Sequence, residues 1–181
     1  MLFRGRNPDV TVWKRFRSGT DGFTFLKHTR PQGGDYYEAF VSANAERVVD
    51  LFYTMSEQLA PAIDVEIVDL RTETTWKGES AALPDVRDAI ARLKVPLATY
   101  GGVEISLYTP DDQLTLTPQL ELYIYARSDK WLYLLQGKGL EERAALADRT
   151  WRSQSSWDRA LAPSLSAAIS QAAERLGLTQ A

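Results

Sequence analysis

Residues 120–127, Leu-Glu-Leu-Tyr-Ile-Tyr-Ala-Arg, carry the clearest strand pattern in the chain. Aliphatic residues occupy every second position, and successive side chains of a strand point to opposite faces. One face is therefore aliphatic, and the other holds Tyr123, Tyr125 and Arg127 together with Glu121. The stretch predicts a strand that packs its aliphatic side on a core and turns an aromatic side the other way.

Further strands are predicted on both sides of this one. Glycine-containing turns at 18–22 and 30–35 are too short for parallel crossovers, so the first strands should pair antiparallel. Residues 71–82 show no clear period and are predicted to be an irregular, flexible loop. The other predicted strands are 10–17, 23–28, 36–41, 63–70, 103–108, 114–116 and 131–136.

Between these predicted strands, apolar residues recur at the spacing of helices. The stripe that runs from Val48 to Leu59 lies between Asn44, a good N-cap residue, and Pro61, which should close the helix. Apolar spacing and the residues at the ends of each segment also predict helices over 84–96, 140–146 and 163–176 and a helical turn at 157–161.

Antiparallel runs of strands separated by helices indicate the α+β class. We expect a single α+β domain over residues 1–181, with a mostly antiparallel sheet built from two meanders and helices packed on one face. A weak pseudo-repeat of 10–93 and 102–176 is a secondary hypothesis.

Length and composition fit an ordinary globular protein. A chain of 181 residues can bury about 70% of its extended surface, so it needs no metal or disulfide for stability. It contains no cysteine, which excludes disulfides, thiolate metal sites and thiol nucleophiles. No apolar run approaches the ~18 residues of a membrane span, and the first residues lack a secretory signal. We expect a soluble, cytoplasmic protein that does not contact membranes.

Charge is unevenly distributed. Residues 1–34 hold seven basic and two acidic side chains, whereas the whole chain has a net charge of −3. A basic arm can bind polyanions, but the overall acidic balance argues against nucleic acid as a partner. These charges can equally line the outer face of two strands. The residues of a polyanion site would be Arg4, Arg6, Lys14, Arg15, Arg17 and Arg30.

Residues for catalysis or metal binding are sparse. His28 is the only histidine, so a multi-histidine metal site is excluded. Asp64 and Glu66 share one strand face, but alternating acids are typical of a solvated face. The turn at 137–139 lacks the remaining residues of a phosphate-binding loop. We therefore predict no catalytic residue, no metal and no cofactor, and the sequence argues against an enzyme without excluding one.

The aromatic residues give the candidate site. If the strands after Gly102 are neighbours, one sheet face collects tyrosines and a tryptophan, which combine buried area with hydrogen-bonding groups. The competing interpretation is that C-terminal helices cover this face. Trp76, in the predicted loop, either contacts a partner or packs back on its own core. The predicted binding residues are Tyr108, Tyr123, Tyr125, Arg127, Trp131, Tyr133 and Trp76.

The favoured function is a non-enzymatic protein-interaction module that uses this face. Its partner is another protein or a second copy of the chain, which makes a homodimer one form of the hypothesis. One alternative is a small-molecule-binding domain or enzyme with a pocket between sheet and helix. Another is a polyanion binder that uses the basic N-terminal strands.

Overall fold

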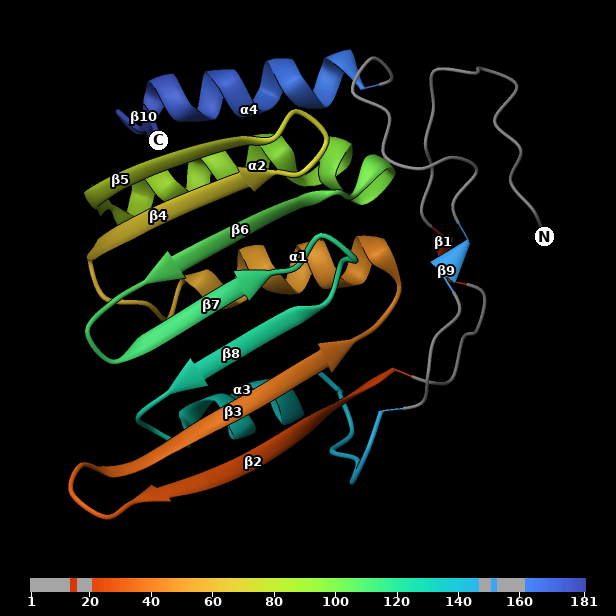
Figure 1. Ribbon diagram of the computed structural model, residues 1–181. Coiled ribbons are helices and arrows are strands. Elements are labelled where there is room, and N and C mark those ends of the chain that lie inside the picture. The colour runs from red at the N-terminus through yellow and green to blue at the C-terminus, as the bar shows by residue number, and fades with distance from the viewer. Residues whose placement is uncertain (1–13, 16–20, 147–150, 153–161) are drawn as a thin grey trace.

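An antiparallel sheet of eight strands forms the body of the computed structural model, which describes residues 14–15, 21–146, 151–152 and 162–181 (Figure 1). The strand order is β10-β5-β4-β6-β7-β8-β3-β2, and neighbouring strands run antiparallel. The strands are β2 (Gly22–Arg30), β3 (Gly34–Ser42), β4 (Ala62–Asp69), β5 (Thr74–Ala82), β6 (Val103–Tyr108), β7 (Asp112–Leu116), β8 (Leu122–Ala126) and β10 (Thr179–Gln180).

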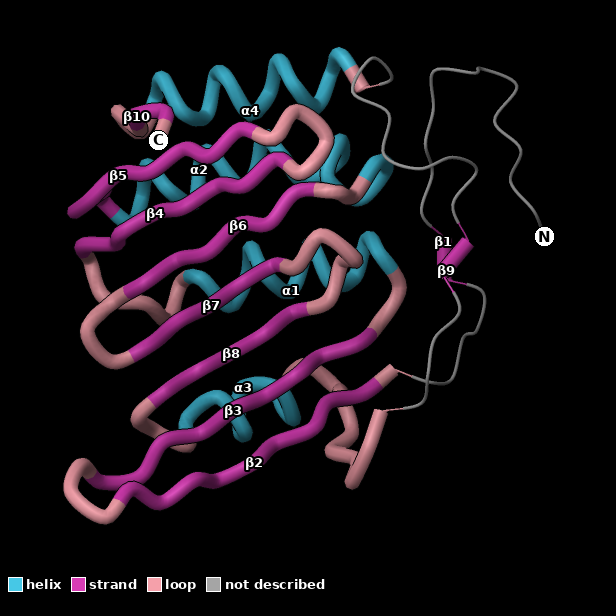
Figure 2. Tube along the Cα trace, viewed as in Figure 1, coloured by secondary structure: helices cyan, strands magenta, loops and turns pink. Residues whose placement is uncertain are grey.

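Helices cover one face of this sheet. In Figure 1, α1 (Ala45–Ser56), α2 (Leu83–Tyr100) and α3 (Lys130–Gly137) lie behind the strands, and α4 (Pro163–Arg175) runs along α2 beyond β5. Figure 2 shows the same layering. The predicted α+β class, the antiparallel sheet and the one-sided helices are confirmed.

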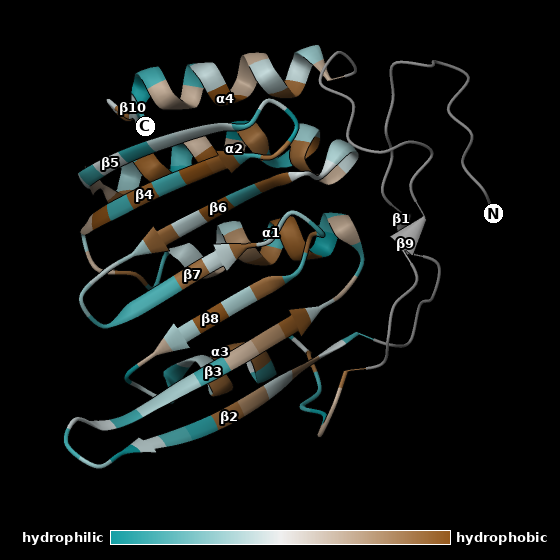
Figure 3. Ribbon diagram, in the orientation of Figure 1, coloured by the Kyte–Doolittle hydropathy of each residue, from teal (hydrophilic) through white to brown (hydrophobic). Residues whose placement is uncertain are grey.

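The core lies between the helices and the sheet. Val48, Phe52 and Met55 of α1 are buried, as are Val65 and Ile67 of β4. Hydrophobic and hydrophilic residues alternate along the strands (Figure 3), because one side of each strand packs on the helices and the other does not. The predicted helix beginning after Asn44 is confirmed, although the Asn44 side chain makes no capping hydrogen bond.

The first predicted strand pairs differently from expectation. Its described residues, β1 (Lys14–Arg15), pair with β9 (Trp151–Arg152) in a separate two-stranded sheet rather than with β2. The rest of that stretch, 10–13 and 16–17, lies outside the described residues. The predicted hairpin of β2 and β3 is confirmed, and β6, β7 and β8 form the second meander.

Three local predictions are wrong. Residues 131–136 belong to the helix α3, not to a strand, because a run of five apolar residues fits either structure. Residues 74–82, predicted as a loop, form β5, whose polar threonines suit a strand near a sheet edge. Residues 140–146 are not helical; the backbone of Phe23 instead exchanges hydrogen bonds with Glu141 and Arg143.

The bounds of the last helix match the prediction, whereas those of α2 differ from it. The last helix starts at Pro163 and ends before Gly177, whose φ of 63° is easily adopted only by glycine. The helix α2 continues through Pro96 to Tyr100 instead of ending there. The predicted turn at 157–161 lies outside the described residues, and the domain boundaries and the pseudo-repeat stay predictions.

Candidate functional site

The sheet face opposite the helices carries the candidate site. Along β8, Leu122 and Ile124 are buried toward the helices, so the alternating Tyr123 and Tyr125 point to the opposite face. Among the described residues, no helix lies over this face in Figures 1 and 2. The expectation that C-terminal helices cover it therefore does not hold for α4, which packs on α2.

Strand pairing brings aromatic residues of β2, β3 and β8 together. The rings of His28 and Tyr36 stack at a centroid distance of 4.7 Å, and the ring of Tyr36 lies 5.1 Å from that of Tyr125. Beside them, Phe40 and Tyr123 pack at 4.9 Å. Aromatic ring pairs of this kind each contribute about 0.5–1.5 kcal/mol beyond the burial of their area.

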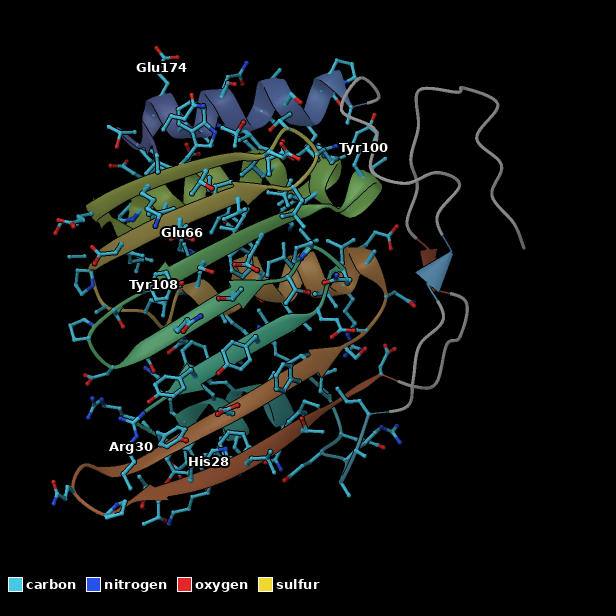
Figure 4. The ribbon with its side chains drawn as sticks, viewed as in Figure 1. His28, Arg30, Glu66, Tyr100, Tyr108 and Glu174 are labelled. Atoms are coloured by element: carbon cyan, nitrogen blue, oxygen red, sulfur yellow. The ribbon has the colours of Figure 1, made fainter. Side chains whose placement is uncertain are left out.

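Arg30 joins this group from the end of β2. Its guanidinium lies 4.4 Å above the Tyr36 ring, and its Nη2 donates a hydrogen bond of 2.6 Å to the Tyr125 hydroxyl. His28 and Arg30 lie together at this end of the sheet in Figure 4. We call this surface the aromatic face and define it by Leu26, His28, Arg30, Tyr36, Glu38, Phe40, Tyr123 and Tyr125.

The aromatic face combines exposed apolar area with a half-buried polar interior. Leu26 and Phe40 are 52% and 38% exposed, large values for such side chains. The His28 Nε2 lies 3.5 Å from Glu38 Oε1 but makes no hydrogen bond. Burial, followed by the charge of Glu38 and then by the neighbouring tyrosines, raises the pKa of Tyr123.

We call the side of the sheet opposite the helices the open face. Beyond the aromatic face it is polar at β7 and β6 and acidic at β4. Ser106 and Thr115, on β6 and β7, are buried and share a hydrogen bond of 2.9 Å. Further on, Glu66 of β4 pairs with Lys77 of β5 at 3.1 Å. Burial, and secondarily the charge of Glu66, raises the pKa of the nearby Glu104 carboxyl. The open face therefore has an aromatic half with a guanidinium and another half where carboxylates gather.

The predicted site residues do not all gather there. Tyr123 and Tyr125 are at its centre, and Tyr108 shares the open face, reached from Tyr125 through Gln113 in the strand register. Arg127 follows β8 and is exposed, and the tyrosines contact Arg30 instead.

The two residues of α3 lie on the other side of the sheet. Trp131 is fully buried, and its Nε1 donates a hydrogen bond of 2.9 Å to Asp112 Oδ1. Tyr133 is 62% exposed, but it belongs to a helix behind the strands. The prediction that both share the tyrosine face is wrong, because it assumed a strand where α3 forms.

Trp76 also packs inward. It pairs with the buried Ile67 in the register of β4 and β5, and its partly buried ring packs against the core. The interpretation of Trp76 as packing on its own core fits this position.

Six members of the aromatic face were missing from the predicted site: Leu26, His28, Arg30, Tyr36, Glu38 and Phe40. The strands 23–28 and 36–41 were predicted, but nothing in the sequence indicated that β3 pairs with β8. That pairing joins segments more than 80 residues apart, so only the folded structure brings the two sets of rings together.

Other kinds of site find little support in the part of the chain that is described. There, no group of three or more histidine, aspartate or glutamate side chains could hold a metal ion. Grooves of about 320 Å³ between α2 and α4 and of about 350 Å³ between α1 and α2 are lined by neither His28 nor Arg127. Of the helices described, none is long and apolar enough to cross a membrane.

Comparison with models of protein families, with curated proteins and with solved structures found no match for the chain. The function is therefore inferred from the geometry of the site.

Proposed function

We propose that this chain is a protein-interaction module that binds through the aromatic face and that its partner is a second copy of the chain. The observation that carries the proposal is the chain of ring contacts on a sheet face that no described helix covers. Rigid aromatic surface with tyrosine hydroxyls and a stacked arginine is the composition typical of protein interfaces.

Complementary polar groups favour a second copy. The open face holds the tyrosines of β8 in one half and Glu66 of β4 in the other, and Ser106 and Thr115 connect Glu66 to Tyr123 in the strand register. A two-fold axis along the strands between β6 and β7 would lay β4 and β5 of one copy over β8 and β3 of the other. Glu66 of one copy would then lie over Tyr123 of the other, whose hydroxyl can donate to a carboxylate, in the isologous arrangement that most homodimers use.

Sedimentation equilibrium over a range of protein concentrations tests the proposal. We expect a reversible dimer whose dissociation constant rises at least about tenfold in Phe40→Ser, since a central aromatic contact contributes 1.4 kcal/mol or more. Tyr133→Ser is the matched control, because it removes an exposed aromatic residue from the opposite side of the molecule.

The wild type and Tyr133→Ser should have the same dissociation constant for the dimer. A monomeric wild type at every concentration, or equal dissociation constants in Phe40→Ser and Tyr133→Ser, would refute the proposal.

A further inference from the structure

Arg71, in the turn between β4 and β5, is a buried cation with unused hydrogen-bond donors. Its side chain is only 3% exposed. Its backbone N–H and its Nε donate to the same oxygen, Asp69 Oδ1, at 3.0 and 3.3 Å. Its two terminal nitrogens, Nη1 and Nη2, find no acceptor. A guanidinium stays charged at every pH at which proteins fold, so four N–H groups are withdrawn from water without compensation.

This arrangement is costly for a residue that serves only the fold. A buried donor without a partner costs about 1–3 kcal/mol, and more when it is charged. Asp69 balances the charge but reaches only the Nε side of the guanidinium. The free edge, with Nη1 and Nη2 side by side, has the geometry that binds two oxygens of one oxyanion.

The Tyr100 ring lies beside this guanidinium, and its hydroxyl keeps a proton that it can donate. The Arg71 Cζ is 5.9 Å from the centroid of the Tyr100 ring, at the end of α2. The Tyr100 hydroxyl accepts a hydrogen bond of 3.4 Å from the hydroxyl of Ser164, in the first turn of α4. A hydrogen bond of 3.0 Å from Leu70 N–H to Gly102 O fixes the turn against the end of α2. Figure 4 shows Tyr100 at this end of the molecule, beside the start of α4.

The start of α4 adds a favourable electrostatic field. Its N-cap residue is Ala162, which has no side chain able to cap. Pro163 has no N–H, so the N–H groups of Ser164 and Leu165 are those that the 13-residue helix itself leaves unpaired, and the helix dipole favours an anion there. The helix terminus and the unpaired guanidinium are independent observations that point to the same kind of ligand.

The geometry points to an anion-binding site formed by Arg71, Tyr100, Ser164 and the first turn of α4, with a carboxylate group as its ligand. Asp69 cancels the formal charge of Arg71, so only the partial positive charge of the helix terminus favours an anion, which suits a monoanion better than a phosphate dianion. A planar monoanion matches both the Nη1–Nη2 edge and this charge balance. The site lies at the turn between β4 and β5, and β6 and β7 separate these strands from β8 and β3, so it is separate from the aromatic face.

Titration followed by ¹H–¹⁵N NMR, including the arginine Nε–H signals, tests the assignment. The probes are acetate, its neutral analogue acetamide, the dipeptide Ala-Ala and inorganic phosphate, all at constant ionic strength. We expect saturable shifts at Arg71 and at the start of α4 with acetate or Ala-Ala and none with acetamide. A stronger response to Ala-Ala indicates a peptide C-terminus as the source of the carboxylate, and a stronger response to acetate indicates a small free acid.

Variants separate binding from folding. Arg71→Gln should weaken acetate binding at least about tenfold, because the paired donors are lost. Ser164→Ala, at an exposed position that should not disturb the fold, should weaken it severalfold. Arg92→Gln is the control, since Arg92 is an exposed arginine of α2 that pairs with Asp88.

Four results would overturn the assignment: shifts that do not saturate, equal shifts with acetamide, affinities unchanged in both Arg71→Gln and Ser164→Ala, or phosphate binding tighter than carboxylate binding.

Discussion

Replacement of Trp131 by phenylalanine tests whether this residue belongs to the core rather than to a binding surface. Trp131 is fully buried, and its Nε1 donates to Asp112, a carboxylate that is itself 8% exposed. A hydrogen bond to a charged group contributes about 1.5–3 kcal/mol. Loss of part of the indole removes roughly another 0.8 kcal/mol per methylene equivalent.

Lys130 limits the loss, because its Nζ lies 3.4 Å from Asp112 Oδ2 and keeps the carboxylate partly compensated. We therefore expect Trp131→Phe to lower the free energy of unfolding by roughly 2–3 kcal/mol. Urea denaturation measures this as a lower transition midpoint with an unchanged m-value.

Tyr133→Ala, two residues further along the same helix, should change the free energy of unfolding by no more than about 0.5 kcal/mol, because Tyr133 is exposed. A similarly small loss in Trp131→Phe would refute the buried position of the indole and its hydrogen bond to Asp112.

Two further variants test the open face and the sheet edge. Burial, and secondarily the charge of Glu66, raises the pKa of the Glu104 carboxyl above its ordinary value of 4.5. The folded chain therefore holds this proton more tightly than the unfolded chain. The free energy of unfolding should fall as the pH rises from about 4.5 through the pKa of the folded state. Glu104→Gln should remove that fall in urea denaturation at several pH values, and an identical pH profile in the variant would contradict this reasoning. In Gly22→Ala the new Cβ would lie 2.7 Å from Arg143 Nε and 2.9 Å from the backbone oxygen of Glu141. This clash should lower the free energy of unfolding by about 1–3 kcal/mol. An unchanged urea midpoint would show that residues 141–143 do not pack on β2.

The sequence predicted those elements whose pattern is local. The strict alternation around Tyr123 indicated a strand because one side of β8 packs on helices and the other does not. The stripe of α1 was equally clear, since only helical spacing brings Val48, Phe52 and Met55 to one side. Such patterns depend only on neighbours in the chain, and they fixed the α+β class.

Elements whose stability depends on distant partners were predicted less well. The spacing of Trp131 and Leu135, both buried in α3, was the only helical signal in a run that is apolar throughout. The strand β5 carries mostly polar residues and is held by pairing with β4. The aromatic face needed the pairing of β3 with β8, and the unpaired guanidinium of Arg71 has no signature in the sequence at all.

Paramagnetic relaxation between two copies of the chain tests the role of the aromatic face. Because the chain has no cysteine, Thr179→Cys provides a single attachment point for a spin label on β10, at the edge of the sheet. A spin-labelled copy without ¹⁵N is mixed with a ¹⁵N-labelled wild-type copy. Only the wild-type copy gives signals, so any broadening of them arises between molecules. The proposed dimer predicts broadening of the amide signals of Phe40, Tyr123 and Tyr125, and none when the label is attached through Tyr133→Cys instead. Absence of intermolecular broadening at these three residues, or broadening confined to the helices, would contradict the aromatic face as an interface.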